Sequence, residues 1–195
     1  MDNLINYFNA GFKNSKISIS KQTLDLIKEI FIFDELTKGD FFIREGQYAN
    51  EIAFLDDGIV RAFYVNNQGK EYNKHLFTAP SIIGSYASLI SKQSNKVAQQ
   101  ALTDCKIWRA PFHKIEELSQ GNYEIERLRR SIAENYFLKY EKKELEMAML
   151  DADQRYQIFQ KEYPGVELKI PQYHIASYLG ISPTQLSRIR KKLKK

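Results

Sequence analysis

Hydrogen-bonding and basic side chains crowd the end of this sequence, between residues 172 and 195. Thr184, Arg188 and Lys191 follow one another at steps of four and three residues, which places them on one side of a helix. A guanidinium can donate two parallel hydrogen bonds to a guanine edge, and a lysine can meet a phosphate. This chemistry suits DNA, and the candidate contact residues are Gln172, Thr184, Gln185, Ser187, Arg188, Arg190 and Lys191.

Two short helices are expected to position these side chains. The first covers residues 172–179, and Gly180 then supplies the left-handed turn that ends it. Ser182 is a typical N-cap, and Pro183 suits the first turn of a second helix. The stripe of this helix that we expect to be buried consists of Leu186, Ile189 and Leu193. The order of helix, glycine-containing turn and basic helix is typical of a helix-turn-helix, and the alternative is an ordinary helical hairpin with a basic end.

The net charge of +5 lies entirely in the C-terminal part of the chain. Residues 151–195 hold nine Lys/Arg and four Asp/Glu, whereas residues 1–150 hold twenty of each sign. No acidic residue follows Glu167. A basic unit joined to a neutral one favours a polyanionic partner, either nucleic acid or an acidic membrane surface. The alternative is a solvated lysine tail, to which Lys194 and Lys195 would belong.

The elements before residue 150 are expected to form a β-rich domain between helices. Residues 2–29 have helical spacing, with Ser20 as the N-cap of a second helix. Residues 30–110 contain short aromatic and β-branched runs separated by turn signals, which predicts seven or eight strands in a sandwich or jelly roll. Helical spacing returns over residues 112–150. The fold class is therefore α+β.

A narrow apolar stripe runs along the long helix predicted after Gly121. Its residues Ile125, Leu128, Ile132 and Tyr136 are separated by three or four positions. Such a stripe on a long helix favours a parallel dimer, in which two copies of the stripe meet. The alternative is that the stripe packs on the chain's own barrel. Asp151 can cap a new helix, so we expect a hinge at residues 149–152 and domains at 1–120, 121–150 and 151–195.

Three groups of segments together resemble the Crp/Fnr family of bacterial transcription regulators. Residues 39–47 and 54–61 are similar to the first half of its cyclic-nucleotide-binding jelly roll, a double-stranded β-helix. The long helix resembles the family's dimerisation helix, and residues 175–190 resemble its helix-turn-helix. The resemblance implies a homodimer that binds a pseudo-palindromic operator. Family members usually continue into a two-stranded wing, and because this sequence ends at Lys195 we expect a helix-turn-helix lacking a full wing.

The residues that bind cyclic nucleotides in that family are not matched here. The family's phosphate-binding cassette has a Gly-Glu pair and, about a dozen residues later, an arginine. Gly84 is kept, Ser85 replaces the glutamate, and the arginine position falls on Asn95 or Lys96. A lysine meets a phosphate as a point charge rather than as a bidentate fork. The departure argues against cyclic AMP, while another small-molecule effector near these four residues stays open.

Other classes of site lack the residues that they need. One cysteine, Cys105, cannot hold a four-cysteine iron–sulfur cluster, and His75 would be an isolated haem ligand. No metal site, catalytic motif, signal peptide or membrane-length apolar run is apparent, so we expect a cytoplasmic protein that is not an enzyme. The candidate partners are double-stranded DNA, a second copy of the chain and RNA polymerase. The alternative function is a ligand-sensing dimer that acts through protein contacts without reading DNA.

Overall fold

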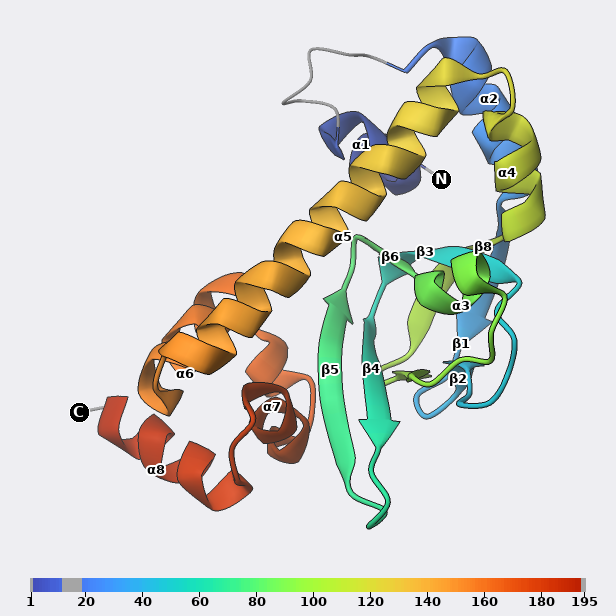
Figure 1. Cartoon of the computed structure of the whole chain (residues 1–195). Helices are drawn as coiled ribbons and strands as arrows, with labels where there is room; N and C mark the ends of the chain where they lie inside the picture. Colours follow the sequence, from blue (N-terminus) through green and yellow to red (C-terminus); the bar gives the residue numbers. More distant parts are fainter. Residues whose placement is uncertain (1, 12–18, 194–195) are drawn as a thin grey trace.

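Two four-stranded antiparallel sheets form the centre of the molecule (Figure 1). The computed structural model describes residues 2–11 and 19–193. The first sheet has the order β1-β8-β3-β6 and the second has the order β2-β7-β4-β5. The strands are β1 (Ile32–Leu36), β2 (Phe41–Ile43), β3 (Glu51–Asp57), β4 (Ile59–Val65), β5 (Glu71–Thr78), β6 (Ser81–Ile83), β7 (Ala98–Ala101) and β8 (Cys105–Pro111). These strands confirm the predicted jelly roll and the α+β class.

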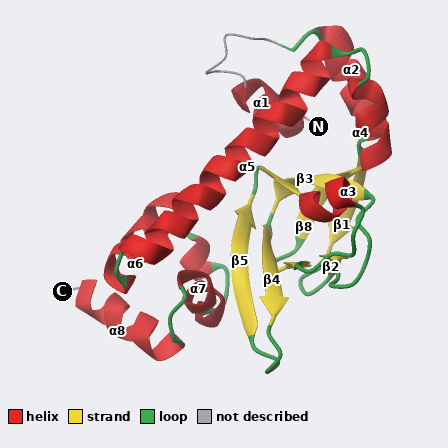
Figure 2. Cartoon of the chain, in the orientation of Figure 1, coloured by secondary structure: helices red, strands yellow, loops and turns green. Residues whose placement is uncertain are grey.

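Helices lie before, within and after the strands (Figure 2). The long helix α5 runs from the N-terminal helices, at the top of the figure, to the three C-terminal helices. The helices are α1 (Asp2–Gly11), α2 (Lys21–Ile30), α3 (Tyr86–Ser91), α4 (Phe112–Ser119), α5 (Tyr123–Met149), α6 (Ala152–Glu162), α7 (Gln172–Leu179) and α8 (Pro183–Leu193), with a 3-10 turn η2 at Val166–Leu168. The single long helix predicted before residue 150 is therefore present as α5.

Side-chain alternation along the strands gives each sheet an inner and an outer apolar face. On β3, Ala53 and Leu55 face the core between the sheets, while Phe54 belongs to a second core outside them. This second core is covered by α1, α2, α4 and the first half of α5. On the other sheet, Leu76 belongs to a third core, which the C-terminal helices complete. Both sheets are thus covered on their outer faces, by different helices.

Side-chain caps fix the ends of several helices where the sequence predicted them. The Ser20 hydroxyl accepts a hydrogen bond from the backbone N–H of Thr23 at the start of α2. Asp151 and Gln154 form a reciprocal capping box at the start of α6. Each such cap contributes about 1 kcal/mol to helix stability. The predicted cap by Asp151 is confirmed, because α5 ends at Met149 and Asp151 caps the next helix, while the hinge at residues 149–152 stays a prediction.

None of the helices in the described ranges combines the length and apolar character required to cross a membrane.

Two leucines in the C-terminal unit give a direct test of the third core. Leu186 is 1% exposed, whereas Leu168 is 90% exposed. We expect Leu186→Ala to lower the free energy of unfolding by about 2–5 kcal/mol, because it removes packed methyl groups and leaves a cavity. The matched variant Leu168→Ala should change it by no more than about 0.5 kcal/mol. Urea unfolding followed by circular dichroism measures both, and equal effects would contradict the assigned core.

Candidate nucleic-acid interface and ligand cavity

The C-terminal helices α7 and α8 form a helix-turn-helix. Gly180 ends α7 with φ +69°, a left-handed conformation that favours glycine, and the N–H of Ile181 donates to the Ala176 carbonyl at 3.0 Å. The Ser182 hydroxyl caps α8 by accepting from the backbone N–H of Gln185 at 3.1 Å. Ile189 turns inward and is buried. The predicted turn, cap and buried Leu186 and Ile189 are therefore confirmed, whereas the prediction for Leu193 is wrong: it is 40% exposed at the end of α8, where no further element covers it within the described residues.

The outward face of α8 carries the side chains predicted to read DNA. In Figure 1, α7 lies between α8 and β5, so α8 faces away from the jelly roll. Arg188 and Lys191 are exposed and form no ion pair with any described residue. The exposed polar residues of this face are Thr184, Gln185, Ser187, Arg188 and Lys191. Five of the seven candidate residues therefore lie together on one exposed surface.

The other two candidates are engaged within the chain. Arg190 is partly buried and pairs with Glu167, with 3.4 Å between Nε and Oε1. Gln172 donates from Nε2 to the Glu167 carbonyl at 3.0 Å. Lys192 also pairs with Asp153, at 2.5 Å. These residues hold α7 and α8 to η2 and α6, while Lys194 and Lys195 lie outside the described residues.

Polar contacts fasten α7 to the outer face of the second sheet. The Asn73 backbone N–H on edge strand β5 donates to the Ser177 hydroxyl at 2.9 Å. The Asn73 side-chain amide donates to the His174 carbonyl at 2.9 Å. Since an unpaired edge strand exposes backbone hydrogen-bonding groups, these contacts also protect β5. The helix-turn-helix is therefore docked on the jelly roll in this structure.

A buried arginine lies at the centre of this docking site. Arg61 on β4 donates to Glu71 on β5 at 2.5 Å and to Gln100 on β7 at 2.7 Å. Its Nη1 lies 3.4 Å from Nδ1 of His174. Burial, reinforced by the Arg61 charge, lowers the pKa of His174 to about 4. The imidazole is thus neutral at pH 7, and its Nδ1 can accept hydrogen bonds from Arg61 and Asn73.

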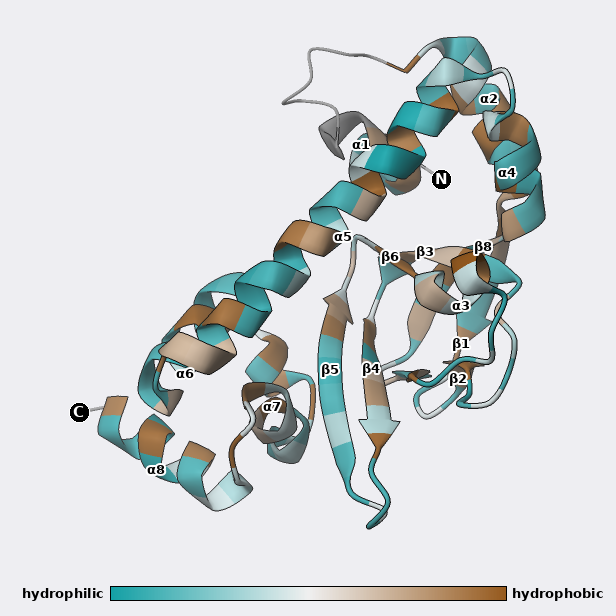
Figure 3. Cartoon of the chain, in the orientation of Figure 1, coloured by the Kyte–Doolittle hydropathy of each residue, from teal (hydrophilic) through white to brown (hydrophobic). Residues whose placement is uncertain are grey.

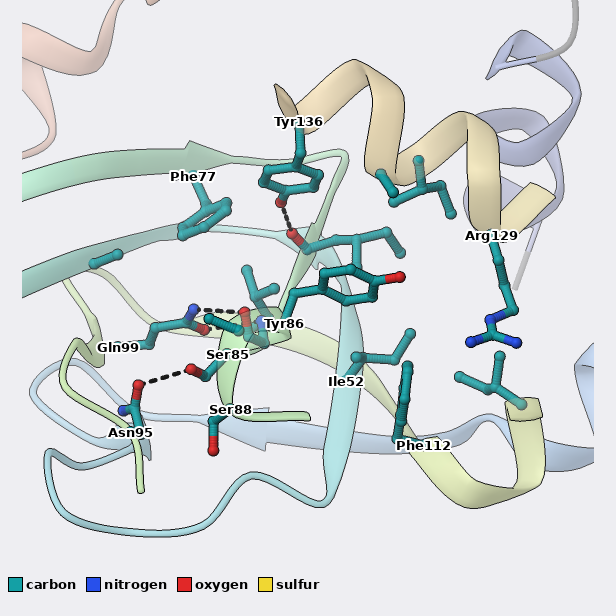
Figure 4. Close-up of a pocket in the computed structure, with 18 of the residues that line it drawn as sticks. Ile52, Phe77, Ser85, Tyr86, Ser88, Asn95, Gln99, Phe112, Arg129 and Tyr136 are labelled. Atoms are coloured by element: carbon teal, nitrogen blue, oxygen red, sulfur yellow. Dashed lines mark hydrogen bonds between the residues drawn. The ribbon is translucent and has the colours of Figure 1, made fainter. Parts of the chain in front are cut away.

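The residues at the positions of the phosphate-binding cassette, Gly84, Ser85, Asn95 and Lys96, lie together at one end of a cavity (Figure 4). Three of them form hydrogen bonds within the chain. The Ser85 hydroxyl donates to Oδ1 of Asn95 at 2.7 Å, and the Asn95 amide donates to the Arg44 and Val97 carbonyls. The backbone of Gly84 exchanges two hydrogen bonds with the Gln99 side chain. Lys96 lines the cavity with an exposed side chain. The predicted effector residues are therefore gathered, but Ser85 and Asn95 bind each other.

The cavity has a volume of about 660 Å³ and is lined mainly by apolar side chains. Pockets of roughly 300–1,000 Å³ are typical of small-molecule sites. Tyr136 on α5 closes one side and donates from its hydroxyl to the Ile82 carbonyl. Nearby, His75 packs against Phe77, and burial together with Lys139 lowers the pKa of His75 to about 4. The cavity therefore extends from the jelly roll to the long helix.

The structure corrects the predicted dimer stripe. Ile125 and Leu128 are 2% and 7% exposed, because they pack into the core under α1, α2 and α4. Ile132 packs against the same core, and Tyr136 packs against the core between the sheets. The stripe thus covers the chain's own jelly roll, which is the alternative that the helical spacing alone left open. Ile125 and Leu128 are thus buried within one chain, while a dimer contact by the partly exposed Ile132 and Tyr136 stays a prediction.

A different stripe of α5 is apolar and exposed. Leu138, Leu145 and Met149 follow one another at steps of seven and four residues, on a different side of α5 from Tyr136 and Tyr140, which face β5. They are 60%, 53% and 77% exposed, and Phe137 beside them is 65% exposed. Figure 3 shows that apolar segments continue along this end of α5. The second half of the helix therefore offers an unpaired apolar surface.

Sequence reasoning missed the residues that dock α7 and those at the far end of the cavity. Arg61 offered a signal, since it is a charged residue within the apolar run of residues 59–65. Asn73, His174 and Ser177 offered none, because their partners lie about a hundred positions away in the sequence. Arg129 offered none either, because it lies in a helix rich in charged residues and nothing local distinguishes it from them. These contacts depend on how separate elements pack.

Comparisons with known proteins agree with this architecture. A family model described as a cyclic nucleotide-binding domain matches residues 33–122. The transcriptional activator protein Anr of Pseudomonas protegens is 22% identical over 188 residues, which cover 89% of this chain and 75% of Anr. The fold is similar to that of FixK2 from Bradyrhizobium japonicum, with a TM-score of 0.76, 17% identity and 85% of each chain covered. It is also similar to a structure described as a crp/fnr-family regulator from Eubacterium rectale, with a TM-score of 0.71 and 18% identity over 94% of this chain and 86% of that one.

The buried His174 predicts how stability depends on pH. Its pKa is about 4 in the fold and about 6.5 when unfolded, so the unfolded chain binds more protons as the pH falls below about 6.5. We expect this histidine alone to lower the free energy of unfolding by about 1–2 kcal/mol between pH 7 and pH 5. His174→Gln should reduce that pH dependence in urea unfolding experiments.

The exposed His113 provides the control for this measurement. His113→Gln should leave the pH dependence of the wild type unchanged. An identical slope for His174→Gln and the wild type would contradict the assignment of a neutral, buried His174.

Proposed function

We propose that this chain, a member of the Crp/Fnr family of transcription regulators, binds a pseudo-palindromic DNA site as a homodimer and without cyclic AMP. The observation that carries the proposal is the outward face of α8, where Arg188 and Lys191 are exposed beside three small or amide side chains. Such a role places the protein in the cytoplasm, where its DNA target lies.

The outward face of α8 suits the major groove. The helix begins at Pro183, and Thr184, Gln185 and Ser187 occupy its first turns, the part of a recognition helix that meets base edges. Arg188 can donate two hydrogen bonds to a guanine, and Lys191 one turn later can meet a phosphate. The ion pair of Arg190 with Glu167 keeps that arginine on the inner side of α8. Base reading therefore rests on Thr184, Gln185, Ser187 and Arg188.

A dimer would place two such helices on one DNA duplex. The exposed stripe of Leu138, Leu145 and Met149 has the spacing of a coiled-coil seam, and pairing it with a second copy would remove these side chains from water. Helix-turn-helix dimers bind half-sites about one helical turn apart, with a two-fold axis between them. The proposed operator is therefore an inverted repeat.

The cavity supports an effector that is not a cyclic nucleotide. Ser85 and Asn95 replace the charged pair of the family's cassette, and each satisfies the other's hydrogen bond. A cyclic phosphate would therefore meet no guanidinium at this end of the cavity, and the cations that line the cavity there include the exposed lysines Lys74 and Lys96. An effector bound here would contact Tyr136 and Phe137 of α5, next to the proposed dimer seam. Differential binding of a few kcal/mol between two conformations is sufficient to shift their populations.

Arg188 tests the reading of DNA. We expect Arg188→Ala to weaken operator binding by about 1–3 kcal/mol, because it removes a bidentate contact to a base, and to relax specificity at that base pair. Lys114 is an exposed lysine on α4, so Lys114→Ala removes the same charge far from α8 and should leave affinity nearly unchanged. Operators selected from genomic fragments and measured by fluorescence anisotropy provide the readout.

Equal affinities for Arg188→Ala and Lys114→Ala would contradict the proposed recognition surface. Such a result, together with an intact dimer, would favour the alternative in which the dimer acts through protein contacts.

The exposed stripe of α5 tests the dimer. We expect the double variant Leu138→Glu and Leu145→Glu to be monomeric in sedimentation velocity at concentrations where the wild type is a dimer, because four like charges would face one another across the seam. Leu168→Glu changes a leucine outside the stripe that is more exposed still, at 90%, and should remain dimeric. A dimeric double variant would place the interface elsewhere.

A further inference from the structure

The far end of the cavity lies outside the jelly roll. It is enclosed by α2, α4 and α5 over the outer face of the first sheet. Its walls are apolar, with aromatic side chains such as Phe31 and Phe112 among aliphatic ones that include Ile27, Ile30, Ile115, Leu118, Leu128 and Ile132. Figure 4 shows how the cavity continues from the cassette residues, past Tyr86 and Ile52, toward α5. A ligand that fills this part must be apolar.

One charged side chain from α5 reaches this apolar end. Arg129 lies beside Phe112 in Figure 4, with its guanidinium carbon 5.6 Å from the centre of the ring. Its Nη1 donates to the Ser119 hydroxyl at 2.6 Å and to Glu126 at 3.3 Å. These contacts fix the guanidinium at the boundary between the apolar wall and α4.

The opposite edge of this guanidinium has no partner within the described part of the chain. The buried Nε of Arg129 forms no hydrogen bond there, while Nη2, which has no protein partner among the described residues, is not buried, the side chain being 22% exposed. A buried donor without a partner costs about 1–3 kcal/mol. Nε and Nη2 form the edge of arginine that donates two parallel hydrogen bonds to a carboxylate. The side chain therefore has an unsatisfied capacity for one carboxylate group.

We propose that this cavity binds an effector with an apolar body and a single carboxylate, held by Arg129. The inference rests on the proposed function, since it names the effector class of the same regulator. The apolar walls take the body of the molecule, and the Nε–Nη2 edge takes the carboxylate. Because Arg129, Ile132 and Tyr136 all belong to α5, the bound molecule would contact the helix that also carries the proposed dimer seam.

The lining disfavours the polar alternatives. A nucleotide would bring several hydroxyl and ring donors and acceptors, whereas most groups lining the apolar end cannot hydrogen-bond. A neutral alkane would leave the Arg129 edge without a partner. An apolar monocarboxylate can pack its body against the walls and accept hydrogen bonds from the guanidinium with its carboxylate.

Isothermal titration with the full chain tests the proposal. The probes are two acids, dodecanoate below its critical micelle concentration and 4-biphenylcarboxylate, which carry the carboxylate on an alkyl chain and on an aromatic body. Dodecanol has the same alkyl chain with a neutral head group, and cyclic AMP is the nucleotide for comparison. We expect at least one of the two acids to bind. Arg129→Gln should weaken that acid about tenfold or more, and change dodecanol binding by less than about twofold, because only the acid uses the charge.

A second variant distinguishes the loss of the carboxylate contact from a loss of protein stability in Arg129→Gln. Leu118→Trp fills the apolar end while leaving Arg129 in place, and it should weaken the acid and dodecanol together. The proposal is overturned if neither acid binds, or if the acid binds equally to wild type and Arg129→Gln. Operator binding by the wild type without ligand, measured separately, shows whether the proposed function has failed instead.

Discussion

A guanidinium that is removed from water must be paired, and this constraint organises one side of the molecule around Arg61. The residue points outward from β4, where the second sheet would otherwise present an apolar face to solvent, yet it is 6% exposed. Glu71 and Gln100 supply its charged and polar partners from the two neighbouring strands. The remaining cover comes from α7, whose His174 stays neutral beside the arginine. The position of the helix-turn-helix thus follows from the need to bury this face.

The long helix α5 has two roles because it is longer than the sheet that it covers. Its 27 residues span about 40 Å at the usual rise of about 1.5 Å per residue. Over the first half, Ile125, Leu128 and Ile132 close the core on the first sheet. Further along, Tyr140 still lies near His75 of β5, whereas Leu138, Leu145 and Met149 lie on another side of the helix and are exposed. One helix therefore serves first the fold of a single chain and then a surface that a second chain could cover.

Local signals allowed much of the fold and the outward face of α8 to be predicted from sequence. Ser182, Pro183 and Gly180 act within a few residues of their own positions, so their types alone indicate a turn between two helices. The predicted dimer contact of Ile125 and Leu128 failed for a physical reason: an apolar stripe has the same spacing whether its partner is another chain or the chain's own sheet. Contacts such as that of Arg61 with His174 join residues 113 positions apart, and no local pattern encodes them. The cavity likewise exists only once α2, α4 and α5 have packed.

The arrangement of α5 gives a physical route between the cavity and the helix-turn-helix. Tyr136 binds the Ile82 carbonyl beside the cavity, and Met147, three turns further on, lies against Gly180 in the turn between α7 and α8. A β-carbon at Gly180 would come within 2.6 Å of the Met147 methyl group, so the two elements touch with little free space. Tyr136 and Met147 belong to the same uninterrupted helix, which ends at Met149 just before the cap of Asp151. The close packing of this turn therefore links the end of α5 directly to the helix-turn-helix, so that the proposed effector would act through a contact that this structure already contains.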